Sequence, residues 1–227
     1  MAMVIKSLLC IQAWILKSST SISRRQMVHE MKAIVPHLVR FICLVPIAQL
    51  AFAAYRNSLG PDPADALATG TGEWALRFLI LSLCVSPLRK IFGLAVIAPF
   101  RRTFGLVALL YASIHVLVYV AFLLQFRWSE IFEDVLERPY ISVGFISFCI
   151  LIILGITSPK MVVRRLGRKW KLVHTAVYPA SIFAIIHLLW ILRADVAEAL
   201  FYAMILVPIL GYRAFLYVTR TYRLSGQ

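Results

Sequence analysis

The segment TFGLVALLYASIHVLVYVAFLLQF, residues 103–126, contains one histidine and no charged side chain. A helix needs about 20 mostly apolar residues to cross the hydrocarbon core of a bilayer, so this segment predicts a membrane-spanning helix. The composition agrees, because 61% of the 227 residues are hydrophobic, whereas soluble domains contain about 45–50%. The mean hydropathy is +0.84. A soluble domain could not bury so much apolar surface, so we expect the bilayer to be the solvent.

Five further apolar segments predict helices of the same kind. Together they indicate an all-α polytopic membrane protein, a six-transmembrane-helix bundle. The predicted spans are Ala33–Tyr55, Trp74–Leu88, Thr103–Phe126, Tyr140–Ser158, Trp170–Leu192 and Ala197–Tyr217. The segment Leu94–Phe100 is also apolar, but it contains Pro99 and is bounded by Lys90 and Arg101. We therefore interpret it as an interfacial loop.

The two ends of the chain are interpreted separately from the bundle. Residues 1–32 contain an apolar run, Val4–Leu16, that is too short to cross a bilayer. We regard residues 1–32 as an N-terminal extension, with Met27 or Met31 as an alternative true start. The transmembrane domain is expected to cover residues 33–220, and residues 221–227 are expected to form a cytoplasmic tail.

The distribution of charge predicts an orientation. The chain carries a net charge of +14, and its basic residues gather in the loops after the second and fourth spans and in the tail, which hold no acid. The acids gather in the other three loops, at Asp62, Asp65, Glu73, Glu130, Glu133, Asp134, Glu137, Asp195 and Glu198. By the positive-inside rule, the basic loops and both termini face the cytoplasm. The charge is thus a topology signal and does not indicate a nucleic-acid surface.

Three of the five histidines, His115, His174 and His187, lie deep inside predicted spans, and His37 lies near the start of the first span. Ionisable residues inside a membrane are costly, so they indicate function. Neutral imidazole is an iron ligand, and helix bundles hold cofactors between facing helices. The histidines therefore favour heme binding, with interhelical hydrogen bonds as the alternative.

The depths of the histidines predict how they pair. His174 and His187 are about 20 Å apart along a helix axis and about 140° apart around it, unless Pro179 changes the local twist. His115 lies roughly 12 residues from the inner end of its span, so His187 is its natural partner. His174 lies near the inner face, where His37 has the matching depth.

Several short motifs give the chain a specific resemblance. They are Leu59-Gly60-Pro61-Asp62-Pro63 with Thr71-Gly72, Arg101-Arg102 leading through Gly105 to His115, Arg138-Pro139-Tyr140, and Leu166-Gly167 followed by Trp170, Leu172, His174, Tyr178 and His187. On these motifs, residues 33–220 resemble the MsrQ (YedZ) family of heme-binding membrane subunits, within the ferric reductase-like transmembrane group. The resemblance implies a bundle of ferric reductase-like type that binds heme b and the flavin FMN. His115, His174 and His187 match the histidines of the family.

The resemblance also implies a partner and a route for electrons. They would pass from the membrane quinone pool to MsrP, a periplasmic molybdenum-containing reductase that repairs methionine sulfoxide in oxidised proteins. The chain would be a non-catalytic electron-transfer subunit in a bacterial inner membrane, with quinol oxidation as its own half-reaction. It has no room for the cytoplasmic FAD and nicotinamide domain of related ferric reductases and NADPH oxidases. The expected donor is therefore a quinol or a separate reductase.

Arg101 stands fourteen residues before His115, where the wider group has a second histidine. A second heme site of the usual kind is therefore expected to be incomplete. Arg101 and Arg102 are instead candidates for a flavin or quinone site, because arginine makes bidentate contacts with phosphate; a role in topology alone is the alternative. The competing function is a proton-coupled transporter or channel that uses its histidines without heme, and a heme absorption spectrum separates the two.

Overall fold

A computed structural model describes residues 34–191 and 197–225, and every regular element in these ranges is helical. The all-α prediction is therefore confirmed. The predicted N-terminal extension, residues 1–32, lies outside the described residues. The chain divides into two compact units, Met1–Val45 and Pro46–Gln227, and each is described by itself.

One apolar helix, Ile34–Tyr55, begins in the first unit and agrees with the first predicted span. Its part within the first unit carries His37. Its remaining residues belong to the second unit, which also contains every element described below.

Helix α2, Pro63–Ile91, begins well before the predicted span Trp74–Leu88. The early start has a local cause, because the Asp62 carboxylate accepts hydrogen bonds from the backbone N–H groups of Ala64 and Asp65, both at 3.1 Å. Such a cap satisfies N–H groups that have no partner within the helix. A proline at the first helical position is also favourable there.

The chain returns along α2 through a short turn and one long helix. The predicted interfacial loop contains a 3₁₀ turn, η1, at Ala95–Ile97. Helix α3, Phe100–Val118, then passes directly into a π-helical turn, η2, at Tyr119–Leu123. The third predicted span is thus helical almost throughout, but it changes its hydrogen-bond pattern just after His115.

A short helix, α4 at Trp128–Glu137, is a feature that the sequence interpretation did not anticipate. The acids assigned there to a loop, from Glu130 to Glu137, lie on it. Helix α5, Pro139–Ile156, follows directly and agrees with the fourth predicted span.

The fifth predicted span consists of three helical pieces. After α6, Lys160–Leu166, the chain forms α7, Arg168–Val173, then the 3₁₀ turn η3, His174–Ala176, and then α8, Val177–Ile191. Pro179 has no N–H to offer the carbonyl four residues earlier, which falls inside η3. This missing bond accounts for the tighter turn at His174, so the helix changes its twist where Pro179 predicts it.

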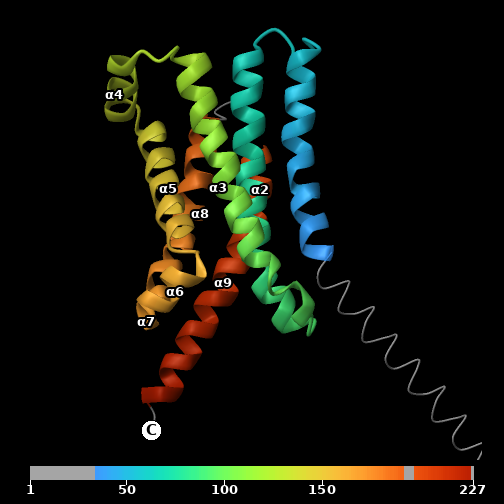
Figure 1. Cartoon of the computed structure of the whole chain (residues 1–227). Helices are drawn as coiled ribbons and strands as arrows, with labels where there is room; N and C mark the ends of the chain where they lie inside the picture. Colours follow the sequence, from blue (N-terminus) through green and yellow to red (C-terminus); the bar gives the residue numbers. More distant parts are fainter. Residues whose placement is uncertain (1–33, 192–196, 226–227) are drawn as a thin grey trace, which may run out of the picture. The chain divides into compact units, whose positions relative to one another are not determined.

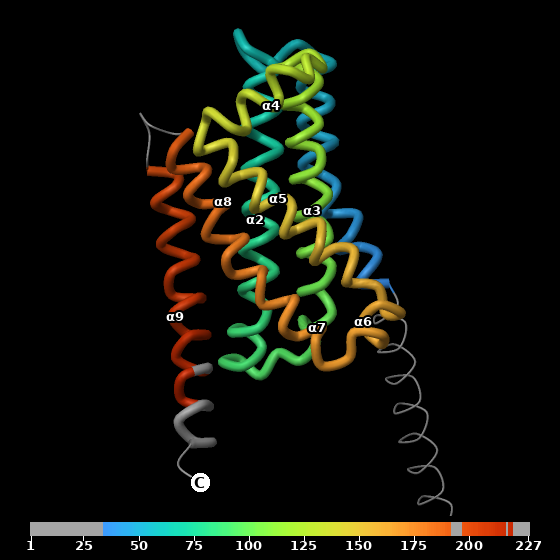
Figure 2. Tube along the Cα trace, turned by 90° about the vertical axis from the view of Figure 1, so that its left-hand side faces the viewer, coloured from blue at the N-terminus to red at the C-terminus, as the bar shows by residue number. Residues whose placement is uncertain are grey.

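Helix α9, Ala197–Ser225, continues beyond the predicted end at Tyr217 and through most of the expected tail. Within the second unit, α2, α3, α5, α8 and α9 run side by side, with α4 at one end and α6 and α7 at the other (Figure 1). Figure 2 shows the same arrangement after a quarter turn, with α9 along one edge.

Within the described residues, five helices are long and apolar enough to cross a membrane: Ile34–Tyr55, Ala95–Leu123, Pro139–Ile156, Arg168–Ile191 and Ala197–Leu216. The predicted number was six. The difference is α2, which has 29 residues but carries charged side chains within the bundle. It remains a sixth long helix, and it packs against α3, α8 and α9.

Two helical hairpins build the second unit, since α2 packs mainly against α3 and α5 mainly against α8. Helix α9 joins them through an apolar core. The core residues from α2, α8 and α9 are Leu76, Ile80, Leu83, Ile185, Tyr202, Leu206 and Ile209. Large apolar side chains such as Met204 and Val207 are exposed on the outside of α9, as expected for a surface in contact with lipid.

Candidate functional site

His115 lies in the C-terminal half of α3, roughly 22 Å along the helix from its first residue, Phe100. Its Nδ1 lies 2.8 Å from the carbonyl oxygen of Ala68 on α2. Gly72, one turn further along α2, faces the same ring, and a Cβ added there would lie 3.0 Å from Nδ1. The ring therefore packs directly on the backbone of α2. Since Nδ1 donates to a carbonyl, Nε2 is left with a lone pair that can bind a metal.

His187 has the same surroundings on the other hairpin. Its Nδ1 lies 2.6 Å from the carbonyl oxygen of Tyr140 on α5. Gly144, one turn along α5, lies still closer to the ring, because an added Cβ would be 2.6 Å from Nδ1. His187 thus also presents Nε2 as its free acceptor.

The two rings face each other between the hairpins. Their centroids are 6.3 Å apart, and their planes are nearly perpendicular, at 82°. Two imidazoles bonded to opposite sides of one metal ion, with bonds of about 2.0–2.1 Å, would have centroids roughly 6 to 6.5 Å apart. The structure thus places side by side the two histidines whose depths predicted a pair, with ring centroids at a distance compatible with two ligands of one metal ion.

The similarity of the two half-sites extends to the sequence. In each, the acceptor carbonyl belongs to the residue 47 positions before the histidine. A constant offset of 72 residues relates Gly72 to Gly144, Ser86-Pro87 to Ser158-Pro159, and His115 to His187. The hairpins α2–α3 and α5–α8 thus repeat one arrangement in the same chain direction. This repeat was the signal that could have revealed the glycine and carbonyl partners of both histidines.

A cavity of about 490 Å³ opens at the ends of the same hairpins that lie beside α6 and α7. Its charged and aromatic lining consists of Arg101, Arg102, Lys160, Arg164, Trp170 and His174. Among the residues that the structure describes, no acidic side chain lines it. Its volume is in the range of small-molecule pockets, and its charged lining is entirely basic.

His174 is held on the wall of this cavity. Its Nε2 lies 3.1 Å from Thr157 Oγ1, and its ring lies over Trp170 at a centroid distance of 4.2 Å. The structure therefore brings His174 together with Arg101 and Arg102 and keeps all three apart from His115 and His187. By the 72-residue offset, His174 corresponds to Arg102, so one hairpin has a histidine where the other has an arginine.

The pairing of His174 with His37 stays a prediction, because His37 lies in the first unit. The metal-ligand set predicted from the sequence was His115, His174 and His187. In the part of the chain that the structure describes, no group of three or more His, Cys, Asp or Glu side chains is arranged to hold a metal ion. The three histidines thus do not form one cluster.

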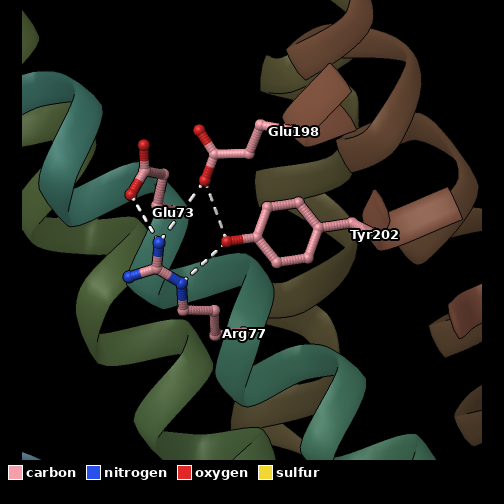
Figure 3. Close-up of polar contacts among 4 residues, drawn as sticks. All are labelled: Glu73, Arg77, Glu198 and Tyr202. Carbon is pink, nitrogen blue, oxygen red and sulfur yellow. Dashed lines mark hydrogen bonds and ion pairs between the residues drawn. The ribbon is translucent and has the colours of Figure 1, made fainter. Parts of the chain in front are cut away.

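A second polar cluster, which the sequence interpretation missed, joins α2 to α9 (Figure 3). Arg77 Nη2 lies 2.7 Å from a Glu73 carboxylate oxygen and 3.4 Å from a Glu198 carboxylate oxygen. Its Nε donates to the Tyr202 hydroxyl at 2.7 Å. That hydroxyl donates in turn to Glu198, at 3.0 Å. The signal was an arginine inside the predicted span Trp74–Leu88, one turn after a glutamate.

This cluster corrects the placement of two acids. Glu73 and Glu198 were assigned to loops, but they lie within α2 and in the first turn of α9. Both carboxylates pair with the guanidinium of Arg77, and this pairing compensates charges that would be costly inside the bundle. We interpret the cluster as a clamp that fixes α9 on α2.

Comparison with known proteins identifies the family. The family described as "Ferric reductase like transmembrane component" matches residues 71–185, a range that includes His115 and His174 and ends two residues before His187. A protein of Xanthomonas euvesicatoria pv. vesicatoria (strain 85-10), named "Protein-methionine-sulfoxide reductase heme-binding subunit MsrQ", is 42% identical over 182 residues, which cover 78% of this chain and 84% of the relative. The chain belongs to the MsrQ family.

Other MsrQ proteins match over a similar length. The relative from Xanthomonas axonopodis pv. citri (strain 306) is 40% identical over 182 residues, covering 78% of this chain and 84% of its own length. The relative from Azospira oryzae is 38% identical over 189 residues, covering 82% and 78%. The ferric reductase-like membership predicted from the motifs is therefore confirmed.

Proposed function

We propose that this MsrQ family member is the membrane electron-transfer subunit of a protein-methionine-sulfoxide reductase system, and that His115 and His187 would hold a heme b. The observation that carries the proposal is the facing pair of imidazoles, each fixed through Nδ1 by a backbone carbonyl. The curated relatives are named as heme-binding subunits of such a system.

The residues present fit this group. A metal-bound histidine almost always donates its other ring N–H to a carbonyl, carboxylate or water, which fixes the tautomer and the ring orientation. Both histidines have that second partner. Two imidazoles alone leave an iron ion under-coordinated, and a porphyrin supplies the four remaining nitrogens. When bound, heme supplies a one-electron carrier in the outer half of the bundle.

The basic inner cavity is the proposed place where electrons enter. Arg101 and Arg102 would bind the anionic part of an electron donor, an FMN phosphate or a polar quinone headgroup, because guanidinium groups form strong bidentate contacts with such oxygens. Trp170 and His174 already stack on each other and offer an aromatic wall for a planar ring. Quinol oxidation at this cavity would be the half-reaction that belongs to this chain.

The proposed direction of transfer follows from the loop charges. The cavity lies among the basic segments that the positive-inside rule assigns to the cytoplasm, and the histidine pair lies nearer the acidic side. Both termini would then be cytoplasmic in a bacterial inner membrane. Electrons would leave at the periplasmic face to a reductase of the MsrP type.

The test is the absorption spectrum and heme content of the purified protein with single substitutions. We expect a reduced-minus-oxidised b-type spectrum in the wild type, and a severe loss of heme in His115→Ala and His187→Ala, because each removes one axial ligand. His29→Ala, outside the predicted spans, is the matched control and should keep its heme. A colourless wild-type protein, or full heme in both ligand variants, would contradict the proposal.

His174→Ala tests the inner cavity separately. If His174 contacts the electron donor, the heme ratio stays at the wild-type value and reduction of the heme by quinol or reduced flavin slows. Loss of about half of the heme would contradict this role and would favour His174 as ligand of a second heme.

A further inference from the structure

The outer end of the bundle contains a hydrogen-bonded chain that starts one turn beyond His115. Tyr119 follows His115 by four residues and therefore lies on the same side of the helix. It opens the π-helical turn η2, whose ring of hydrogen bonds is wider by one residue. Its hydroxyl donates to Asp134 Oδ2 on α4 at 2.5 Å. Gln125 and Phe126, just beyond η2, both have positive φ, of 48° and 58°.

Asp134 is the centre of this chain. It is only 9% exposed, although the other acids of α4 are on its surface or at its rim. Its second carboxylate oxygen, Oδ1, lies 3.1 Å from Arg138 Nε. A buried carboxylate is costly unless it is paired and hydrogen-bonded. Asp134 meets both conditions, through Tyr119 at the start of η2 and Arg138 directly before α5.

Arg138 carries the connection to the second histidine. It immediately precedes α5, whose second residue, Tyr140, provides the carbonyl that accepts from His187 Nδ1. The Asp134 carboxylate, and after it Tyr140, raise the pKa of the Arg138 guanidinium, so this cation is fully charged between them. Ser142 Oγ donates to the Val135 carbonyl at 2.5 Å and closes the same junction between α4 and α5.

We infer that Tyr119, Asp134 and Arg138 are positioning residues for the histidine pair. They tie the outer end of the α3 hairpin, one turn from His115, to the first turn of α5, where the carbonyl partner of His187 lies. The two half-sites belong to separate hairpins, and this link joins them at the end of the bundle next to the histidines, in addition to the apolar core shared with α9. The nearly perpendicular ring planes are what this link maintains. The inference rests on the proposed heme ligation.

The test uses Asp134→Asn and Tyr119→Phe, with Glu133→Gln as the matched control. Glu133 is the exposed neighbour of Asp134 on α4, so its substitution removes the same charge from the same helix without touching the chain of hydrogen bonds. The readouts are the electron paramagnetic resonance g-values of the oxidised protein, which depend on the angle between the imidazole planes, the midpoint potential, and the rate of heme loss.

We expect Asp134→Asn and Tyr119→Phe to shift the g-values and the potential, and to weaken heme binding about tenfold, the lower end of the range for residues that orient a metal ligand. Glu133→Gln should match the wild type. Arg138→Lys should restore part of what Arg138→Ala loses, because it keeps the cation but not the planar fork.

Identical g-values and heme loss in Asp134→Asn, Tyr119→Phe and Glu133→Gln would overturn the inference. Tyr119→Phe removes only one hydroxyl and keeps the ring, so it carries the test if Asp134→Asn does not accumulate. The proposed heme ligation would be refuted by a different result, namely full heme content in both His115→Ala and His187→Ala.

Discussion

The close approach of Gly144 to His187 allows a graded test of the histidine site. An added Cβ would lie 2.6, 2.7 and 2.9 Å from Nδ1, Cε1 and Cγ of the ring, whereas ordinary contacts begin at 3.4 Å. In Gly144→Ala the ring or the backbone of α5 must therefore move by about 0.8 Å. The ring cannot retreat freely, because Nδ1 is held 2.6 Å from the Tyr140 carbonyl.

The expected cost has two parts. Inserting a methyl group into a well-packed contact costs about 1–3 kcal/mol, and losing the hydrogen bond to Tyr140 costs about 1 kcal/mol more. Because that hydrogen bond orients a proposed ligand, we expect heme binding in Gly144→Ala to weaken about 10- to 100-fold. Gly72→Ala meets His115 at 3.0 Å and more, so the same effect should be present but smaller.

The assay is the heme-to-protein ratio after purification, followed by the rate at which heme transfers to an excess of a heme-free acceptor protein. Gly211→Ala on α9 is the control, since an added Cβ there meets nothing within 4 Å. It should keep its heme and gain a little stability from the better helix former. A wild-type ratio and transfer rate in Gly144→Ala, or an equal loss in all three variants, would refute the reasoning.

Three further predictions concern the rest of the second unit. Arg77→Leu leaves two half-buried carboxylates without their cation, so it should lower the stability in detergent by about 1–3 kcal/mol, a value between those of exposed and buried ion pairs. Arg127→Leu, which removes one partner of an exposed ion pair, should change the stability little. Equal melting temperatures of the two variants would contradict this prediction. Reporter fusions at Asp65 should read periplasmic and at Arg165 cytoplasmic, and the reverse would overturn the orientation. Arg101→Gln should weaken FMN binding, followed by flavin fluorescence, about tenfold, with Arg101→Lys in between, and unchanged binding would remove the arginine from the site.

Most of the fold was predictable because hydropathy acts over whole segments. The limits of α5 and of the first helix, and the pairing of His115 with His187, follow from residue type, length and depth alone. Two local sequence signals also indicate features that hydropathy does not. Asp62 before Pro63 indicates a capped helix start at α2, and an arginine one turn after Glu73 indicates a buried ion pair, which the structure shows as the clamp to α9.

Hydropathy and residue type determine which segments enter the bilayer and which polar side chains must find partners there, because the cost of burying a polar group does not depend on the fold. Only the tertiary structure decided which partners they find. The acceptors for His115 and His187 are backbone carbonyls, which every residue has, and their glycine neighbours are defined by the absence of a side chain. The burial of Asp134 likewise depends on how α4 folds onto α5 and meets Tyr119 of η2, an arrangement that no single segment encodes.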